Sequence, residues 1–167
     1  SINTHQPDEM RRGQVELIRQ KAIIRAYLNA EARDQVIAGD LLAAHLWATT
    51  SAQAIEAAPG RLAFAYPTEG FALYADNAVI LRESSRPELA HQFLNYLLRP
   101  EVAAAIVDVS RTATANGAAR DLLPPELREN RVLYPDAATL ERGEWFAPLP
   151  SAAQRLRDRL WTEIKSA

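Results

Sequence analysis

The chain has 167 residues, of which 48% are hydrophobic and 24% are charged, and its formal net charge at pH 7 is -2. This composition is typical of globular domains and excludes collagen-like, low-complexity and wholly disordered chains. The length suits one domain or fragments of two, because about 150 residues per domain is a common value.

The distribution of charged and apolar residues excludes several classes of protein. The 19 basic and 21 acidic residues are interleaved without a basic face, so we expect no nucleic-acid partner. The longest apolar runs, 41–44 and 102–107, are far shorter than the roughly 18–20 residues of a membrane span. Residues 1–7 lack the features of a secretory signal, so we expect any signal to lie upstream or to have been removed.

Proline, glycine and amphipathic spacing predict the helices. The first begins at Pro7, and the last follows Pro150. The predicted helices in chain order cover residues 7–20, 31–38, 49–58, 84–97, 100–109, 116–123, 125–129 and 136–142, and the last helix places Ala153, Leu156, Leu160 and Ile164 on one stripe. The hydroxyls of residues 49–51 are candidates for capping the third helix.

Apolar and β-branched segments predict the strands, and 41–47 is the most apolar of them, interrupted only by His45. The predicted strands and extended segments cover residues 23–28, 41–47, 62–66, 71–74 and 78–81. The alternation of strands and helices predicts an α/β fold with a mostly parallel sheet. The strands are few and the chain begins within a helical pattern, so we expect part of a larger fold.

Signatures of catalysis and metal binding are absent from the sequence. The chain has no cysteine, which excludes disulfides, thiolate metal sites and a cysteine nucleophile. His5, His45 and His91 do not have the spacing of zinc ligands. No Gly-x-Ser-x-Gly elbow and no glycine-rich phosphate loop occur. We therefore expect no enzyme activity, no cofactor and no metal.

Trp47 and the two threonines that follow are candidates for ligand recognition. Trp47 ends the predicted strand 41–47, and ligands of open α/β sheets bind beyond the carboxyl ends of strands. A tryptophan at this position either faces a cleft or covers the core. The hydroxyls of Thr49 and Thr50 either contact a ligand or cap the next helix, and the pattern favours capping.

Tyr74 and Asp76 form a second candidate. In an extended strand, side chains two positions apart project from the same face. A ring beside a carboxylate suits an organic ammonium, which the ring attracts and the carboxylate binds through its N–H groups. The alternative is a hairpin turn at Asp76-Asn77 between two apolar runs, and the pattern alone favours this turn.

Two segments resemble a known family. Residues 92–104 (QFLNYLLRPEVAA) and residues 133–145 (LYPDAATLERGEW) are similar to segments of the spermidine/putrescine-binding proteins of bacterial ABC importers. The dipeptide Leu46-Trp47, and the segment 67–70 leading into Tyr74-Ala75-Asp76, agree with this family as well. The similarity extends over the whole chain.

The resemblance implies a periplasmic (extracytoplasmic) receptor with the type II periplasmic-binding-protein fold. Its two α/β lobes close around a polyamine, which is then delivered to an ABC permease. By this correspondence residues 1–74 belong to the second lobe and residues 75–135 supply the crossover strand and helices of the first lobe. Residues 136–167 return to the second lobe. Family chains are longer, so we expect a C-terminal half, completed by an N-terminal half or by exchange of elements with a second copy.

The resemblance also implies roles for individual residues. Trp47 matches a cleft tryptophan, Tyr74 an aromatic that stacks on the ligand, and Asp76 the carboxylate that binds an ammonium, which outweighs the hairpin interpretation. Three further matched positions depart from the usual residues, namely Thr50, Thr112 and Phe146. Because these departures remove hydrogen-bonding groups, an amino acid derivative or an opine is the alternative ligand. A stand-alone ligand-sensing domain is the alternative from another class.

Two more carboxylates lie near these positions in the sequence. Glu69 follows Pro67-Thr68 and is interpreted as a turn residue, and Glu144 is interpreted as structural. One carboxylate, Asp76, therefore remains as the candidate for binding an ammonium.

Overall fold

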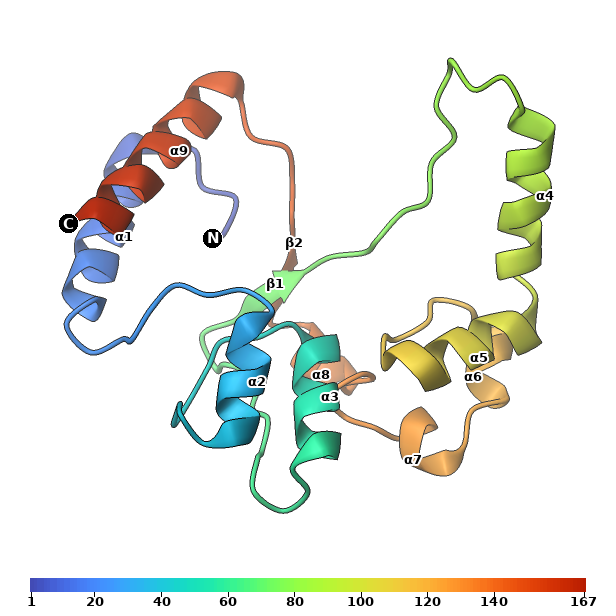
Figure 1. Cartoon of the computed structure of the whole chain (residues 1–167). Helices are drawn as coiled ribbons and strands as arrows, with labels where there is room; N and C mark the ends of the chain where they lie inside the picture. The colour runs from blue at the N-terminus through green and yellow to red at the C-terminus, as the bar shows by residue number, and fades with distance from the viewer. The chain divides into compact units, whose positions relative to one another are not determined.

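The structure is a computed structural model that describes residues 1–167 and consists mainly of helices with one two-stranded sheet (Figure 1). The chain divides into two compact units. The first comprises Ser1–Leu28, Pro67–Tyr74 and Arg142–Ala167, and the second comprises Asn29–Tyr66 and Ala75–Glu141. The expected lobes 1–74, 75–135 and 136–167 concern a complete receptor and stay a prediction.

Two long helices pack side by side in the first unit, α1 (Pro7–Gln20) and α9 (Ser151–Ser166) (Figure 1). α1 begins at a proline and carries two acidic residues in its first turn, which suits the positive end of a helix dipole. α9 buries the apolar stripe that its spacing predicts, including Ala153, Leu160 and Ile164. Tyr27 meets Trp161 of α9 edge to face, with ring centroids 4.9 Å apart.

The sheet of the first unit pairs β1 (Phe71–Leu73) with β2 (Gly143–Trp145) in parallel. The register places Phe71 opposite Gly143 and Leu73 opposite Trp145. Gly70 precedes β1 with φ of 116°, and a Cβ there would lie 2.9 Å from the carbonyl oxygen of Arg142. Glycine is therefore required where the chain enters this strand.

The second unit contains the remaining helices. They are α2 (Glu31–Ala38), α3 (Ala48–Ala57), α4 (Pro87–Leu97), α5 (Pro100–Ser110), α6 (Gly117–Asp121), α7 (Pro125–Arg128) and α8 (Ala137–Leu140). α2 ends at Gly39 with φ of 87°, the left-handed conformation that glycine commonly adopts at the end of a helix. α2 packs on α3, and α5 packs on α4 and α6. The core of this unit is formed by Val107, Leu123 and Leu127, with Ala104 and Tyr134 packed against it.

Four of the predicted strands are wrong. Residues 23–28, 41–47, 62–66 and 78–81 form turns or irregular segments without ladder hydrogen bonds. The reason is that a strand satisfies its backbone through neighbouring strands, and no neighbour within the chain pairs with these segments. The burial expected for 41–47 is also absent, because Leu42 is fully exposed. β2 was not predicted. It begins at Gly143, directly after the helix predicted over 136–142.

The observed fold is thus rich in helix, with a small parallel sheet in place of the larger one expected. The single strand pair is parallel, as predicted. None of the helices combines the length and hydrophobicity needed to cross a bilayer.

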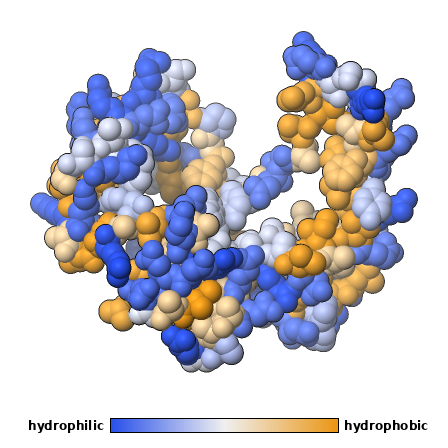
Figure 2. All heavy atoms as spheres, viewed as in Figure 1, coloured by the Kyte–Doolittle hydropathy of each residue, from blue (hydrophilic) through white to orange (hydrophobic).

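A row of large apolar side chains is exposed along α4. Leu89, Phe93 and Tyr96 retain 54%, 58% and 49% of their accessible surface, and we call them the α4 stripe. Figure 2 shows hydrophobic residues gathered along this helix and toward α5. The apolar spacing of this helix places Leu89, Phe93, Tyr96 and Leu97 on one face, and in the structure the first three of them remain about half exposed.

Candidate functional site

Trp47 lies at the start of α3 in the second unit. It is the N-cap residue, with extended backbone angles (φ -62°, ψ 148°), and half of its surface is exposed. No side chain caps α3, so the capping role favoured for Thr49 and Thr50 is wrong. The Thr49 hydroxyl instead donates a hydrogen bond to the Thr112 hydroxyl at 3.2 Å. This bond brings Thr112 to the helix turn that carries Trp47 and Thr50.

Tyr74 and Phe146 lie at the same end of the sheet in the first unit. Tyr74 directly follows β1 and Phe146 directly follows β2, and the Phe146 amide donates to the Leu73 carbonyl at 3.2 Å. Tyr74 is 41% exposed and Phe146 is 54% exposed. Because the strands are parallel, both rings stand beyond carboxyl ends, where ligands of α/β proteins bind. The sequence could not reveal this pairing, because β2 was not recognised.

Asp76 lies two residues beyond Tyr74 and is exposed. The hairpin interpretation of Asp76-Asn77 is wrong, since β1 pairs in parallel with β2 and residues 74–81 contain no turn. The side-chain amide of Asn77 donates to the carbonyl of Ala75 at 2.8 Å. Tyr74 belongs to the first unit and Asp76 to the second, so their convergence on one ligand stays a prediction.

Glu144 has a structural role, as its interpretation from the sequence states. Its carboxylate accepts hydrogen bonds from the Ser1 hydroxyl, from the Ile2 amide at 3.0 Å and from the Asn3 side chain at 2.8 Å. The hydrogen bonds from Ser1 and then from the Ile2 amide lower the pKa of Glu144. Glu69 likewise lies in a turn and accepts from the Thr68 hydroxyl at 3.0 Å. Neither carboxylate is therefore assigned to a ligand.

The lowered pKa of Glu144 predicts an acid-induced release of residues 1–3. A carboxyl whose pKa is depressed by folding stabilises the fold at neutral pH, and this contribution is lost as the pH falls through the depressed pKa. We expect the amide resonances of Ile2 and Asn3 to titrate with a midpoint below 4.5, the ordinary value for glutamic acid. The titration should vanish in Glu144→Gln and persist in the control Glu141→Gln. Its persistence in Glu144→Gln would assign it to another group.

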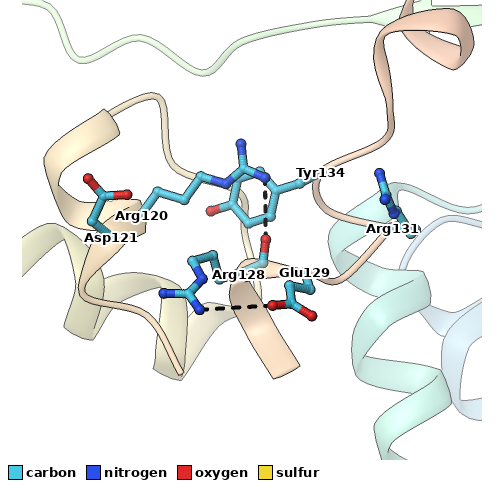
Figure 3. Close-up of a pocket in the computed structure, with 6 residues that line it drawn as sticks. All are labelled: Arg120, Asp121, Arg128, Glu129, Arg131 and Tyr134. Atoms are coloured by element: carbon cyan, nitrogen blue, oxygen red, sulfur yellow. Dashed lines mark hydrogen bonds and ion pairs between the residues drawn. The ribbon is translucent and has the colours of Figure 1, made fainter. Parts of the chain in front are cut away.

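A hollow in the second unit lies outside the predicted site (Figure 3). Arg120 stacks over the Tyr134 ring, with 4.2 Å from the guanidinium carbon to the ring centroid, and donates to the Arg128 carbonyl at 3.3 Å. The hollow is lined by Arg120, Asp121, Arg128, Glu129, Arg131 and Tyr134. Three guanidinium groups against two carboxylates repel a polyamine, so this hollow is not assigned to one. No motif or spacing in the sequence places these six residues together.

Comparison with known proteins identifies the family. The family model described as bacterial extracellular solute-binding protein matches residues 16–142. The chain belongs to this family. This match confirms the resemblance to spermidine/putrescine-binding proteins that the motifs at 92–104 and 133–145 indicate.

Several curated relatives of this solute-binding protein are named for polyamines. It is 31% identical to the putrescine/cadaverine-binding protein of Pseudomonas aeruginosa over 99% of its own length and 48% of the relative. It is 34% identical to a putrescine-binding periplasmic protein of Escherichia coli over 90% of its length and 42% of the relative. The spermidine/putrescine-binding periplasmic protein of Escherichia coli is 29% identical over 99% of the chain and 47% of the relative. The chain spans about half the length of these relatives.

Proposed function

We propose that this chain is part of a periplasmic receptor that binds a polyamine-like cation for an ABC importer, and that it carries no enzymatic activity. The observation that supports this best is the similarity, over nearly the whole chain, to relatives named for putrescine, cadaverine and spermidine. The alternative within the same class is a receptor for an amino acid derivative or an opine, since Thr50, Thr112 and Phe146 offer no charge to a ligand.

The proposed architecture is the type II periplasmic-binding-protein fold. Residues 1–74 and 136–167 belong to one lobe, and residues 75–135 to the other. The relatives extend beyond the matched span, and we infer that an equivalent segment completes the sheets of both lobes. The lack of strand pairing at apolar segments such as 41–47 fits this proposal, because a strand needs neighbouring strands for its backbone hydrogen bonds. A second copy that exchanges elements is the other way to cover them.

The proposed ligand chemistry combines stacking with charge. Tyr74, Phe146 and Trp47 present exposed ring surface to the methylene chain of a polyamine. Asp76 accepts N–H groups of one ammonium in charge-assisted hydrogen bonds, and a ring nearby adds a cation–π attraction. Lobe closure then removes water, which strengthens these interactions.

Calorimetric titration of the complete receptor tests this proposal, with a neutral ligand of the same shape as the comparison. We expect putrescine and spermidine to bind, and 1,4-butanediol, which carries hydroxyls in place of the two ammonium groups of putrescine, to show no measurable heat. Equal binding of putrescine and butanediol contradicts recognition by charge. Binding of an opine or an amino acid without binding of either polyamine favours the alternative ligand.

A further inference from the structure

Three side-chain interactions connect one face of α3 to the end of α5. Thr49, Gln53 and Glu56 are four and three residues apart, so they follow one another along this face. Thr49 bonds to the Thr112 hydroxyl at 3.2 Å, and Gln53 donates its amide to the Ser110 carbonyl at 2.9 Å. Glu56 accepts two hydrogen bonds of 2.7 Å each from the guanidinium of Arg111. We call these three interactions the α3–α5 clamp.

The ion pair is the strongest part of this clamp. Arg111 meets Glu56 with both arms of its guanidinium, a geometry that a lysine cannot reproduce. A third bond of 3.1 Å to Asp108 orients the same guanidinium from its own helix. The Arg111 side chain is 22% exposed and the Glu56 side chain is 57% exposed, so water screens the pair in part. The hydrogen bond from Arg111 lowers the pKa of Glu56, which keeps the carboxylate charged at neutral pH and below.

The backbone of Arg111 is also unusual. It is the C-cap of α5 and the one residue other than glycine with a positive φ, at 57°. This left-handed conformation favours glycine or asparagine at a helix end. This conformation is unfavourable for an arginine, and here it accompanies a side chain that reaches Glu56 on α3. Thr112 directly follows, so the backbone conformation of Arg111 sets the direction in which the chain leaves α5 toward Thr112.

We propose that the α3–α5 clamp positions the candidate ligand-binding residues at the start of α3 and after the end of α5. This inference rests on the proposed function, in which Trp47, Thr50 and Thr112 contact the ligand, and both helices lie in the second compact unit. Glu56 and Arg111 are then positioning residues: they touch no ligand, but they hold Thr112 against the helix turn of Trp47 and Thr50. The geometry of the candidate site thus depends in part on an ion pair that does not touch the ligand.

The absence of cysteine makes the geometry of the clamp measurable. In a Thr49→Cys/Thr112→Cys variant the two thiols replace hydroxyls that lie 3.2 Å apart, within reach of a disulfide after a small adjustment. We expect mild oxidation to join them. Adding Arg111→Gln should slow disulfide formation at least about tenfold, because the two segments then meet less often.

Matched variants separate the clamp from a general loss of charge or of fold. Arg19→Gln removes the same charge from an exposed ion pair with Glu16 on α1 and should leave the rate within about twofold. Glu56→Gln should act like Arg111→Gln, and Arg111→Lys should fall between. Circular dichroism monitors helix content in each variant. An unchanged rate in both Arg111→Gln and Glu56→Gln, with helix content retained, overturns the proposal.

Putrescine binding then tests the role of the clamp at the site. We expect Arg111→Gln to weaken the binding of putrescine to the complete receptor at least about tenfold, because Thr112 is then no longer held beside Trp47 and Thr50 before the ligand arrives. Equal affinity of the parent and Arg111→Gln overturns the positioning role while leaving the receptor assignment intact. If the complete receptor binds no polyamine, the proposed function fails, and the cross-linking rates alone decide whether the clamp forms.

Discussion

Replacing Asp76 with asparagine is expected to weaken putrescine binding by at least about 100-fold, which corresponds to about 2.7 kcal/mol. Asparagine keeps the shape and one acceptor oxygen but removes the negative charge. In a closed cleft the ligand ammonium would then be desolvated without its ionic partner, a change that costs about 3–5 kcal/mol when a buried pair is broken. Part of that cost is relieved if the cleft admits water, so we expect the lower bound. Isothermal titration calorimetry of the complete receptor, with and without the substitution, measures the difference.

Asp8→Asn is the matched control for this measurement. Asp8 is 95% exposed in the first turn of α1, so its replacement makes the same chemical change far from every candidate ligand contact in the sequence. The control should leave affinity within about twofold, since exposed pairs contribute little. An unchanged affinity in Asp76→Asn removes Asp76 from the site, and equal weakening in both variants indicates that net charge alone attracts the ligand.

The helices could be predicted from the sequence because a helix forms its hydrogen bonds within its own segment. Pro7 with its acidic first turn, and Gly39 at the end of α2, are local signals, and both helix ends lie where they indicate. The strands could not be predicted in the same way. Residues 41–47 have the composition of a buried strand, but whether they form one depends on a partner segment elsewhere.

The sequence could predict properties of single residues of the candidate site, but not the contacts between residues far apart in the chain. The exposure of Trp47 fits a role at a surface, but the partner of Thr49 was missed, because a threonine in a first helix turn usually caps it. The α3–α5 clamp was missed for a similar reason. Spacing places Glu56 on the same face as Thr49, but nothing in the spacing tells which distant residue that face meets.

The exposed α4 stripe predicts that the chain associates with itself. Leu89, Phe93 and Tyr96 follow one another along α4, and about half of the surface of each remains exposed. Burial of such a row against a second copy is favourable by about 25 cal/mol per Å² of apolar surface removed from water. We expect the chain of 18.5 kDa to sediment as a dimer or a larger species at micromolar concentration. Phe93→Glu should weaken this association at least about thirtyfold, as the loss of a central aromatic anchor does in other interfaces.

Gln92→Glu provides the control, because it adds the same charge at the neighbouring exposed position of α4. Phe93 is itself 58% exposed, so its replacement removes little packing within the chain, and thermal unfolding of the variant should stay close to that of the parent. Analytical ultracentrifugation across a hundredfold range of concentration distinguishes the outcomes. A monomer at every concentration contradicts self-association through the α4 stripe. A dimer that persists in Phe93→Glu places the contact on another exposed segment, such as 78–81.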